Sequence, residues 1–289
     1  MERILVTGSS GMVGSQVLKH LMRRNLHAIA GVRDITSVNE EFKKNIDFIH
    51  LDYNDLISIE KAKKIVDKIF LVPPMHPGMS DMMRNVLDRM QSIQYIVCIS
   101  ASGADANSSF PLLKEHGKIK DYIVNSGIPA TFIAPSHFYQ NYFEFSSKYI
   151  KEKNNFYLPQ GNAKKTMIDT YDIGEIAAKI LTEDGHAGNT YNLAAYDYDN
   201  LEIASTFTKV LGRQVNYNDI DPEDYRKMLQ ENKMPNWKIE IILKLNAAWK
   251  AGSRLKSNEE TKLLLGRNPR TFEEFLGDNK DFFIQSIPA

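Results

Sequence analysis

The sequence has little cysteine, no excess of charge of either sign and no long apolar run. Its single cysteine, Cys98, cannot form an intrachain disulfide, and it lies in the apolar run Tyr95–Ile99, so we interpret it as a core residue. The 36 basic and 36 acidic residues balance, which gives no broad electrostatic attraction to nucleic acid or to an anionic membrane. No segment approaches the ~20 apolar residues needed to cross a bilayer. The expected partner is therefore a small or apolar ligand, with no nucleic acid and no membrane.

Short apolar runs alternate with amphipathic stretches in the first half of the chain. Such alternation is typical of a parallel sheet that is covered by helices on both faces. It predicts strands at residues 4–7, 27–32, 47–51, 69–72, 95–99 and 130–134, and a later strand at 189–193. The predicted fold class is α/β: a Rossmann-type, doubly wound parallel sheet with a smaller, mostly helical C-terminal part that covers the substrate.

The sequence pattern changes after Ser136, where aromatic residues and helical patterns become more frequent. The segment Asp221-Pro222-Glu223-Asp224 predicts a helix start, with a capping aspartate, proline in the first turn and acids at the positive end of the dipole. No repeat or low-complexity linker divides the chain. We expect one unit over residues 1–289, with a Rossmann core at about 1–135 and a mixed remainder at about 136–289 that supplies late Rossmann elements and substrate cover.

The beginning of the chain shows no secretory signal. Met1-Glu2-Arg3 is followed at once by an apolar strand pattern, which leaves no room for the regions of a signal peptide. We therefore expect a cytoplasmic protein, and a monomer or homodimer.

A glycine-rich segment, Gly8-Ser9-Ser10-Gly11-Met12-Val13-Gly14, follows the first predicted strand and opens the first predicted helix. The first glycine permits a positive φ, the second lets backbone N–H groups approach a diphosphate, and the third allows close helix–strand packing. The spacing G-x-x-G-x-x-G is one residue longer than the dinucleotide fingerprint G-x-G-x-x-G. We expect this turn to bind a dinucleotide through Gly8, Ser10, Gly11, Met12 and Val13.

The second predicted strand ends in Gly31-Val32-Arg33-Asp34, where an NAD-selective fold places an acid on the adenosine ribose. Arg33 offers a guanidinium to a 2′-phosphate, which favours NADP(H), with NAD(H) as the alternative cofactor. Asp34 leaves two arrangements open, because its carboxylate can pair with Arg33 or bind the ribose hydroxyls itself.

With these motifs the chain resembles the NmrA-like branch of the atypical short-chain dehydrogenases over nearly its full length. That branch includes NAD(P)H-quinone oxidoreductases, triphenylmethane and azo-dye reductases, and NADPH-sensing regulators. Further segments that carry the resemblance are Leu71-Val72-Pro73-Pro74, Ser100-Ala101-Ser102-Gly103, Asn125-Ser126-Gly127-Ile128-Pro129-Ala130-Thr131, Gln140-Asn141 and Gly266-Arg267-Asn268-Pro269-Arg270-Thr271-Phe272-Glu273-Glu274-Phe275.

The resemblance also implies roles for individual residues. It implies that Asp52 lies near the adenine, that Val72 and Pro73 border the cofactor, and that Ser100 and Ala101 approach the nicotinamide. The resemblance also implies a cofactor contact at Pro135. The arginine of the family's Arg-Pro pair is replaced here by Ala134.

The tyrosine acid of the orthodox short-chain dehydrogenases is missing. Their Tyr-x-x-x-Lys pair lies on the helix after the fifth strand, where alignment back from Ser126-Gly127 places Leu112 and His116. The match Tyr149 to Lys153 falls after the sixth strand, so we interpret it as coincidence. Histidine at the lysine position resembles the quinone and dye reductases, and His116 is the candidate catalytic residue, able to contact the cofactor and relay a proton near neutral pH. The alternative is a solvent-facing helix histidine.

A reductase without a tyrosine acid requires an acceptor whose reduced product is already stable. Quinones, azo compounds and cationic dyes qualify, because the accepted charge is delocalised. We therefore hypothesise NADPH-dependent hydride transfer to a planar aromatic or quinone-like acceptor, with Phe138 and Asn141 as substrate contacts and Trp237 or Trp249 on a C-terminal cover. The alternative is a redox sensor that binds NADP(H) without turnover. An epimerase would need the absent tyrosine, and no metal site is expected.

Overall fold

The computed structural model describes residues 2–37, 46–253, 255 and 258–284. The chain falls into two compact units, and each is built from two separate stretches of sequence. The first unit comprises Met1–Pro135 and Thr170–Leu193, and the second comprises Ser136–Asp169 and Ala194–Ala289. The expectation that the chain behaves as one unit stays a prediction.

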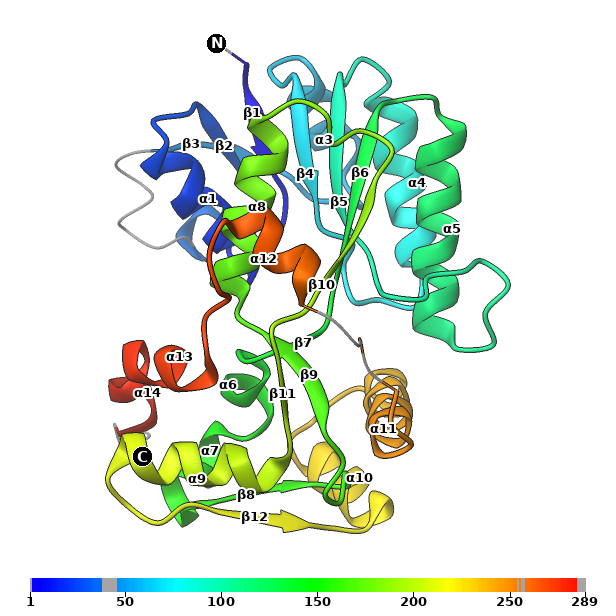
Figure 1. Ribbon diagram of the computed structural model, residues 1–289. Helices are drawn as coiled ribbons and strands as arrows, with labels where there is room; N and C mark the ends of the chain where they lie inside the picture. Colours follow the sequence, from blue (N-terminus) through cyan, green and yellow to red (C-terminus); the bar gives the residue numbers. More distant parts are fainter. Residues whose placement is uncertain (1, 38–45, 254, 256–257, 285–289) are drawn as a thin grey trace. The chain divides into compact units, whose positions relative to one another are not determined.

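The first unit is a seven-stranded sheet in which every pair of neighbouring strands is parallel (Figure 1). The strand order is β10-β6-β5-β4-β1-β2-β3. The strands are β1 (Ile4–Val6), β2 (Ala28–Val32), β3 (Asp47–His50), β4 (Lys68–Leu71), β5 (Tyr95–Ile99), β6 (Ala130–Pro135) and β10 (Thr190–Leu193). The predicted α/β, Rossmann-type class is confirmed, and each of the seven expected strands is present to within one residue at either end.

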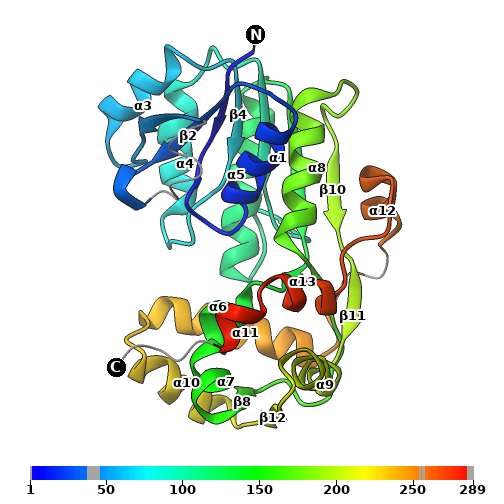
Figure 2. The same cartoon turned by 90° about the vertical axis from the view of Figure 1, so that its left-hand side faces the viewer.

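Helices cover both faces of this sheet, which explains why its central strands are apolar along their whole length. Helices α1 and α8 pack together on one face, and α3, α4 and α5 cover the other (Figures 1 and 2). The helical elements are α1 (Gly14–Arg23), the 3-10 turn η1 (Ile35–Ser37), α3 (Leu56–Lys63), α4 (Met79–Arg89), α5 (Pro111–Asn125) and α8 (Thr170–Thr182). Cys98 is 1% exposed in this core, as expected.

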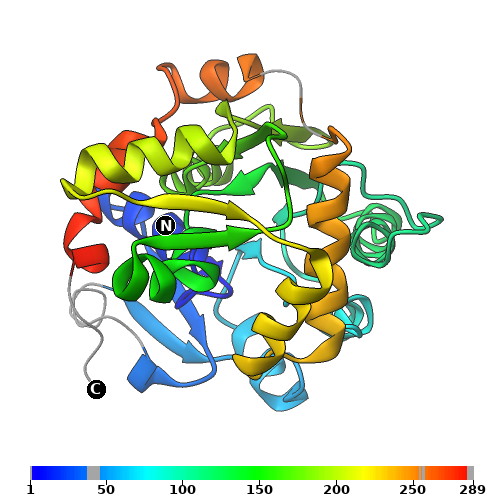
Figure 3. The ribbon, with the colours of Figure 1, turned by 90° about the horizontal axis from the view of Figure 1, so that it is seen from below.

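The second unit combines helices with two small sheets that the sequence did not predict. One sheet has the order β11-β9-β7 and the other pairs β12 with β8. Its strands are β7 (His137–Phe138), β8 (Asn155–Leu158), β9 (Lys165–Ile168), β11 (Tyr196–Tyr198) and β12 (Asn216–Asp219). Figure 3 shows the β8–β12 pair, with the yellow-green helix α9 (Asn200–Leu211) along it.

An aromatic core holds the second unit together. Tyr139, Phe207, Phe272 and Phe275 are all buried and lie in ring contact through Phe272. The remaining helices are α6 (Asn141–Phe145), α7 (Ser147–Lys153), α10 (Pro222–Glu231), α11 (Asn236–Lys250), α12 (Glu259–Leu265), α13 (Phe272–Asp278) and α14 (Lys280–Ile284).

The predicted helix start at Asp221 is confirmed. Its carboxylate accepts a hydrogen bond of 2.8 Å from the backbone N–H of Glu223, which caps α10. Among the described helices of the whole chain, none combines the length and the apolar character that a membrane span requires.

Candidate functional site

The glycine-rich segment forms a tight turn between β1 and α1. Gly8 has a φ of +60°, and its carbonyl accepts a hydrogen bond of 2.9 Å from the N–H of Gly11. Gly14, the first residue of helix α1, packs closely on the same carbonyl. A Cβ at position 14 would lie only 2.3 Å from the oxygen of Gly8. Glycine is therefore required at position 8 by conformation and at position 14 by space.

The N-terminus of α1 is left without a side-chain cap. Val13 precedes the helix, and the first turn carries no acidic residue. Ser9 cannot serve as a cap, since its hydroxyl donates to the carbonyl of Val6 at 2.5 Å. Ser10 and Gly11 are exposed on this turn. An uncapped helix N-terminus beside exposed backbone is a ready binding site for an anion, so the turn fits the diphosphate of a dinucleotide.

The strand order places this turn at the topological switch point of the sheet, where successive strands begin to be added on the opposite side of β1. The chain moves from β1 to β2 and β3 on one side, and to β4, β5 and β6 on the other. Ligands of open α/β sheets bind outside the carboxyl ends of the strands at this point. Val72 and Pro73 follow β4, Ser100 and Ala101 follow β5, and Pro135 ends β6, so all five expected contacts lie at this edge.

Two residues that the sequence did not single out fix the turn to the end of β4. The hydroxyl of Thr7 donates to the carbonyl of Phe70 at 3.1 Å and accepts from the N–H of Val72 at 2.8 Å. The hydroxyl of Tyr53 donates to the carbonyl of Val72 at 3.0 Å. The only sequence signal was the position of Thr7 directly before Gly8. These bonds hold Val72 beside the turn.

Arg33 lies exposed directly after β2, and its guanidinium has no ion-pair partner in the described part of the chain. The carboxylate of Asp34 accepts from the N–H of Thr36 at 2.8 Å and from its hydroxyl at 2.7 Å. No ion pair between Arg33 and Asp34 is found in the described part of the chain, and the ribose contact of Asp34 stays a prediction. Asp52 follows β3 and accepts a bond of 2.8 Å from the N–H of Asn54.

His116 lies on α5, on the same helix face as Leu112, one turn away. The helix is pressed against the loop after β5, since a Cβ on Gly117 would come within 2.1 Å of the backbone at Asp105 and Ala106. Nδ1 of His116 is buried and has no hydrogen-bond partner among the described residues. Burial lowers the pKa of His116 to about 4, so the ring is neutral at pH 7.

A neutral imidazole can donate one hydrogen bond through its N–H and accept one at its other ring nitrogen, but it lacks the second proton that an acid would deliver. The residue as a whole is half-buried with its Nδ1 enclosed, and both interpretations of His116 stay predictions. A proton relay near neutral pH would require ligand binding to raise the pKa of His116. The catalytic role of His116 stays a prediction.

The two expected substrate contacts lie in the second unit, on adjoining elements. Nδ2 of Asn141 lies 3.2 Å from Nδ1 of His137, and the ring of Trp249 packs edge-on against His137 with 4.4 Å between centroids. Phe138 is next to His137 on β7, so strand alternation turns the two side chains to opposite faces of the small sheet. The structure therefore joins Asn141 to Trp249 through His137, and does not bring Phe138 to them.

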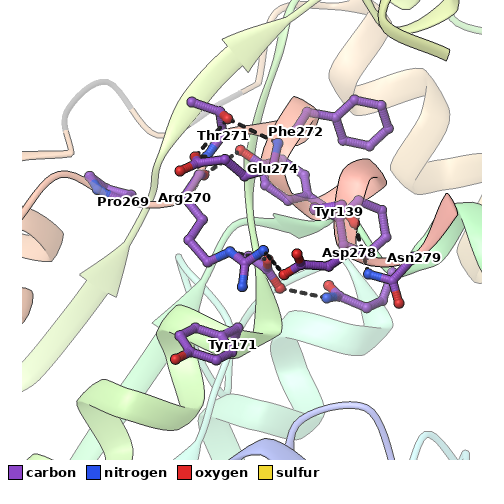
Figure 4. A network of polar contacts seen from close by, with 12 residues as sticks. Tyr139, Tyr171, Pro269, Arg270, Thr271, Phe272, Glu274, Asp278 and Asn279 are labelled. Atoms are coloured by element: carbon purple, nitrogen blue, oxygen red, sulfur yellow. Dashed lines mark hydrogen bonds and ion pairs between the residues drawn. The ribbon is translucent and has the colours of Figure 1, made fainter. Parts of the chain in front are cut away.

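A polar network anchors the two residues between Phe138 and Asn141 (Figure 4). The hydroxyl of Tyr139 donates to the carbonyl of Arg270 at 3.2 Å, and Nε2 of Gln140 donates to Oδ1 of Asp169 at 2.6 Å. The guanidinium of Arg270 joins these groups, with Nε 3.3 Å from Oδ2 of Asp169 and Nη2 paired with Asp278. The C-terminal segment that carries the family resemblance thus fixes the backbone beside the expected substrate residues.

Comparison with known proteins identifies relatives of the whole chain. The model of the NmrA-like family matches residues 1–276. The chain is 28% identical over 279 residues to the prestalk A differentiation protein A of Dictyostelium discoideum, which covers 94% of this chain and 90% of that protein. It is 27% identical over 275 residues to the NAD(P)H azoreductase of Xenophilus azovorans, which covers 94% and 96%.

Solved structures share the fold. The NADPH complex of a quinone oxidoreductase from Escherichia coli has a TM-score of 0.81 at 23% identity, covering 95% of this chain and 99% of that one. The NADP(H) complex of triphenylmethane reductase from Citrobacter sp. has a TM-score of 0.80 at 22% identity, covering 94% and 98%. NmrA, a negative transcriptional regulator, has a TM-score of 0.72 at 14% identity, covering 96% and 95%.

Proposed function

The chain belongs to the NmrA-like family, and from that premise we propose that it is an NAD(P)H-dependent oxidoreductase that transfers hydride to an electron-poor conjugated acceptor. The observation that carries the proposal is the uncapped N-terminus of α1 behind the Gly8–Gly14 turn, at the topological switch point of the sheet. The relatives and fold neighbours named as azo, quinone and dye reductases support the choice of acceptor class.

The residues of the first unit would hold the dinucleotide along the carboxyl edge of the sheet. The backbone of Gly8 and of residues 10–13 would bind the diphosphate, and Asp52 would lie near the adenine. Val72, Pro73, Ser100, Ala101 and Pro135 would border the remaining length of the cofactor. When bound, the dinucleotide supplies a hydride. We propose NADP(H) as the preferred form because Arg33 is exposed at the end of β2 with a guanidinium that no carboxylate of the described chain neutralises.

The protein's own contribution to the reaction is positioning. Leu112 offers no proton, and His116 is neutral at pH 7 because burial lowers its pKa to about 4. An acceptor that delocalises the added charge needs no acid from the protein, whereas a simple ketone does. Asn141 would orient such an acceptor, with Trp249 packed on His137 beside it, and a contact from Phe138 would have to come from the other face of β7.

Steady-state oxidation of NADPH tests this function directly. Purified protein is mixed with NADPH and, in turn, a quinone, an azo compound, a cationic triphenylmethane dye and a simple ketone. We expect turnover with at least one conjugated acceptor and none with the ketone. The second candidate is a sensor that binds NADP(H) without turnover. It is supported by the absence of the tyrosine acid at position 112 and by the fold shared with a transcriptional regulator. Tight binding of NADPH without turnover of any acceptor would favour the sensor and reject the reductase.

A further inference from the structure

A charged side chain is buried inside the second unit without a carboxylate to neutralise it. Lys165 on β9 is 1% exposed. Its Nζ donates to Oε1 of Gln160 at 2.6 Å and to Oδ1 of Asn200 at 2.8 Å, and it lies 5.6 Å from the ring centroid of Tyr142. No carboxylate in the described part of the chain comes within ion-pair distance of this ammonium. The groups that touch the ammonium are therefore neutral dipoles and an aromatic face, and the charge of Asp199 acts on it from beyond ion-pair distance.

The amide groups around Lys165 do not depend on it. Oε1 of Gln160 also accepts from Nδ2 of Asn200 at 3.0 Å, and Oδ1 of Asn200 also accepts from the hydroxyl of Tyr142 at 3.3 Å. Nε2 of Gln160 donates to Oδ1 of Asn246 at 2.5 Å. Each amide oxygen thus keeps a donor if the ammonium is removed. Because burying a charge is unfavourable, the ammonium adds a desolvation penalty that the cluster itself does not require.

The charge lies close to the segment that we assign to the acceptor. Lys165 and Met167 point to the same face of the small sheet, and Met167 pairs with His137 on β7, so His137 and Lys165 share that face. Burial lowers the pKa of His137 well below its ordinary value, and the charge of Lys165 lowers it further. His137 contacts Asn141, and Tyr142 is the next residue along α6.

We propose that Lys165 is a specificity-determining residue, which favours neutral acceptors that become anions on reduction and disfavours cationic acceptors. The proposal rests on the proposed function for the place of the acceptor. A neutral quinone that gains a hydride becomes a hydroquinone monoanion, which later takes a proton from water, while the dinucleotide is oxidised. A cationic triphenylmethane dye that gains a hydride becomes a neutral leuco compound. A positive charge in a medium of low dielectric, which Lys165 carries below a pH of about 7, stabilises the first product and repels the second acceptor.

The test compares the binding of two acceptors to the same protein without cofactor. Menadione, a neutral quinone, and crystal violet, a cationic dye, are titrated while tryptophan fluorescence is followed, since Trp249 packs on His137. Burial lowers the pKa of Lys165 to about 7, so titration at about pH 6 keeps the ammonium charged. In Lys165→Met we expect the ratio of the dye's Kd to the quinone's Kd to fall by about tenfold. A misfolded variant would weaken both ligands alike and would not produce this shift.

Lys164 provides the matched control, because it is the preceding residue, is half-exposed and is neutralised by Glu202 at 3.0 Å. Lys164→Met should leave the ratio unchanged. Lys165→Gln removes the charge but keeps a hydrogen-bonding side chain, and it replaces the methionine variant if that variant does not fold. An unchanged ratio in the folded Lys165 variant would overturn the proposal. Absence of NADPH turnover in the wild type would reject the proposed function, while the binding ratio would still decide the role of Lys165.

Discussion

Arg33 carries the expected preference between the two pyridine dinucleotides. Charge-assisted hydrogen bonds to a phosphate contribute roughly 1.5–3 kcal/mol, which corresponds to about 10- to 100-fold in affinity. We therefore expect Arg33→Ala to raise the KM for NADPH by about that factor and to change the KM for NADH little. The measurement is steady-state kinetics with both dinucleotides and one acceptor. Arg24→Ala, at the opposite end of α1, is the control and should affect neither KM. Equal losses for NADPH and NADH in Arg33→Ala would remove Arg33 from the 2′-phosphate.

Single residues also show where sequence reasoning stops. Arg33 was recognisable because it follows a strand and a glycine at a position with a known role in dinucleotide binding. Lys165 was not recognisable, because it directly follows Lys164 and the sequence does not distinguish the buried lysine from the exposed one. In the structure Lys164 pairs with Glu202, while Lys165 donates to Gln160 and to Asn200, which lies 35 residues away along the chain, and Gln160 in turn donates to Asn246. Such a cluster exists only after the chain has folded.

The turn and helix α1 act as one element in binding, and Gly14 is the point where they touch. A methyl group at this position would lie 2.3 Å from the carbonyl oxygen of Gly8, so the helix must move away from the turn. We expect Gly14→Ala to lower the free energy of unfolding by about 1–3 kcal/mol and to weaken NADPH binding at least tenfold. Thermal unfolding and calorimetric titration measure the two effects.

Gly277 provides the control for this substitution. It lies in helix α13, where an added Cβ meets no atom within 4 Å. Gly277→Ala should leave NADPH binding unchanged and raise stability by about 0.5–1 kcal/mol, because alanine is the better helix former. Unaltered NADPH affinity in Gly14→Ala would contradict the assignment of this turn to the diphosphate.

Elements differ in how well the sequence predicts them, and the reason is their environment. The central strands of the seven-stranded sheet are buried on both faces, so they read as apolar runs such as Tyr95–Ile99, whereas the edge strands β3 and β10 are partly exposed. The strands β11 and β12, with the sequences Tyr-Asp-Tyr and Asn-Tyr-Asn-Asp, are short and polar. β12 pairs with β8, about 60 residues earlier in the chain, and this non-local pairing leaves no local pattern. The second unit was therefore expected as mostly helical, without its small sheets.

At the scale of the whole molecule, the expected cofactor contacts and substrate contacts fall in different units. Gly8, Arg33 and Ser100 belong to the first unit, whereas Phe138 and Asn141 belong to the second. The sequence predicted both groups and late Rossmann elements after residue 136, and the structure gives the bounds of the returning segment as residues 170–193. The late strand at 189–193 was expected without a named partner, and in the structure it pairs with β6 as the edge strand of the sheet.

The two units are connected by three passages of the chain, at residues 135–136, 169–170 and 193–194, and neither unit is a continuous segment. Unfolding of the first unit would release both ends of residues 136–169 and one end of 194–289, so we expect the units to unfold together. NADPH at 100 times its Kd should then raise the free energy of unfolding of the entire chain by about 2.7 kcal/mol. Differential scanning calorimetry should show one transition that moves as a whole. Two transitions, of which NADPH moves only one, would show that the units are independent and would contradict the single-unit expectation.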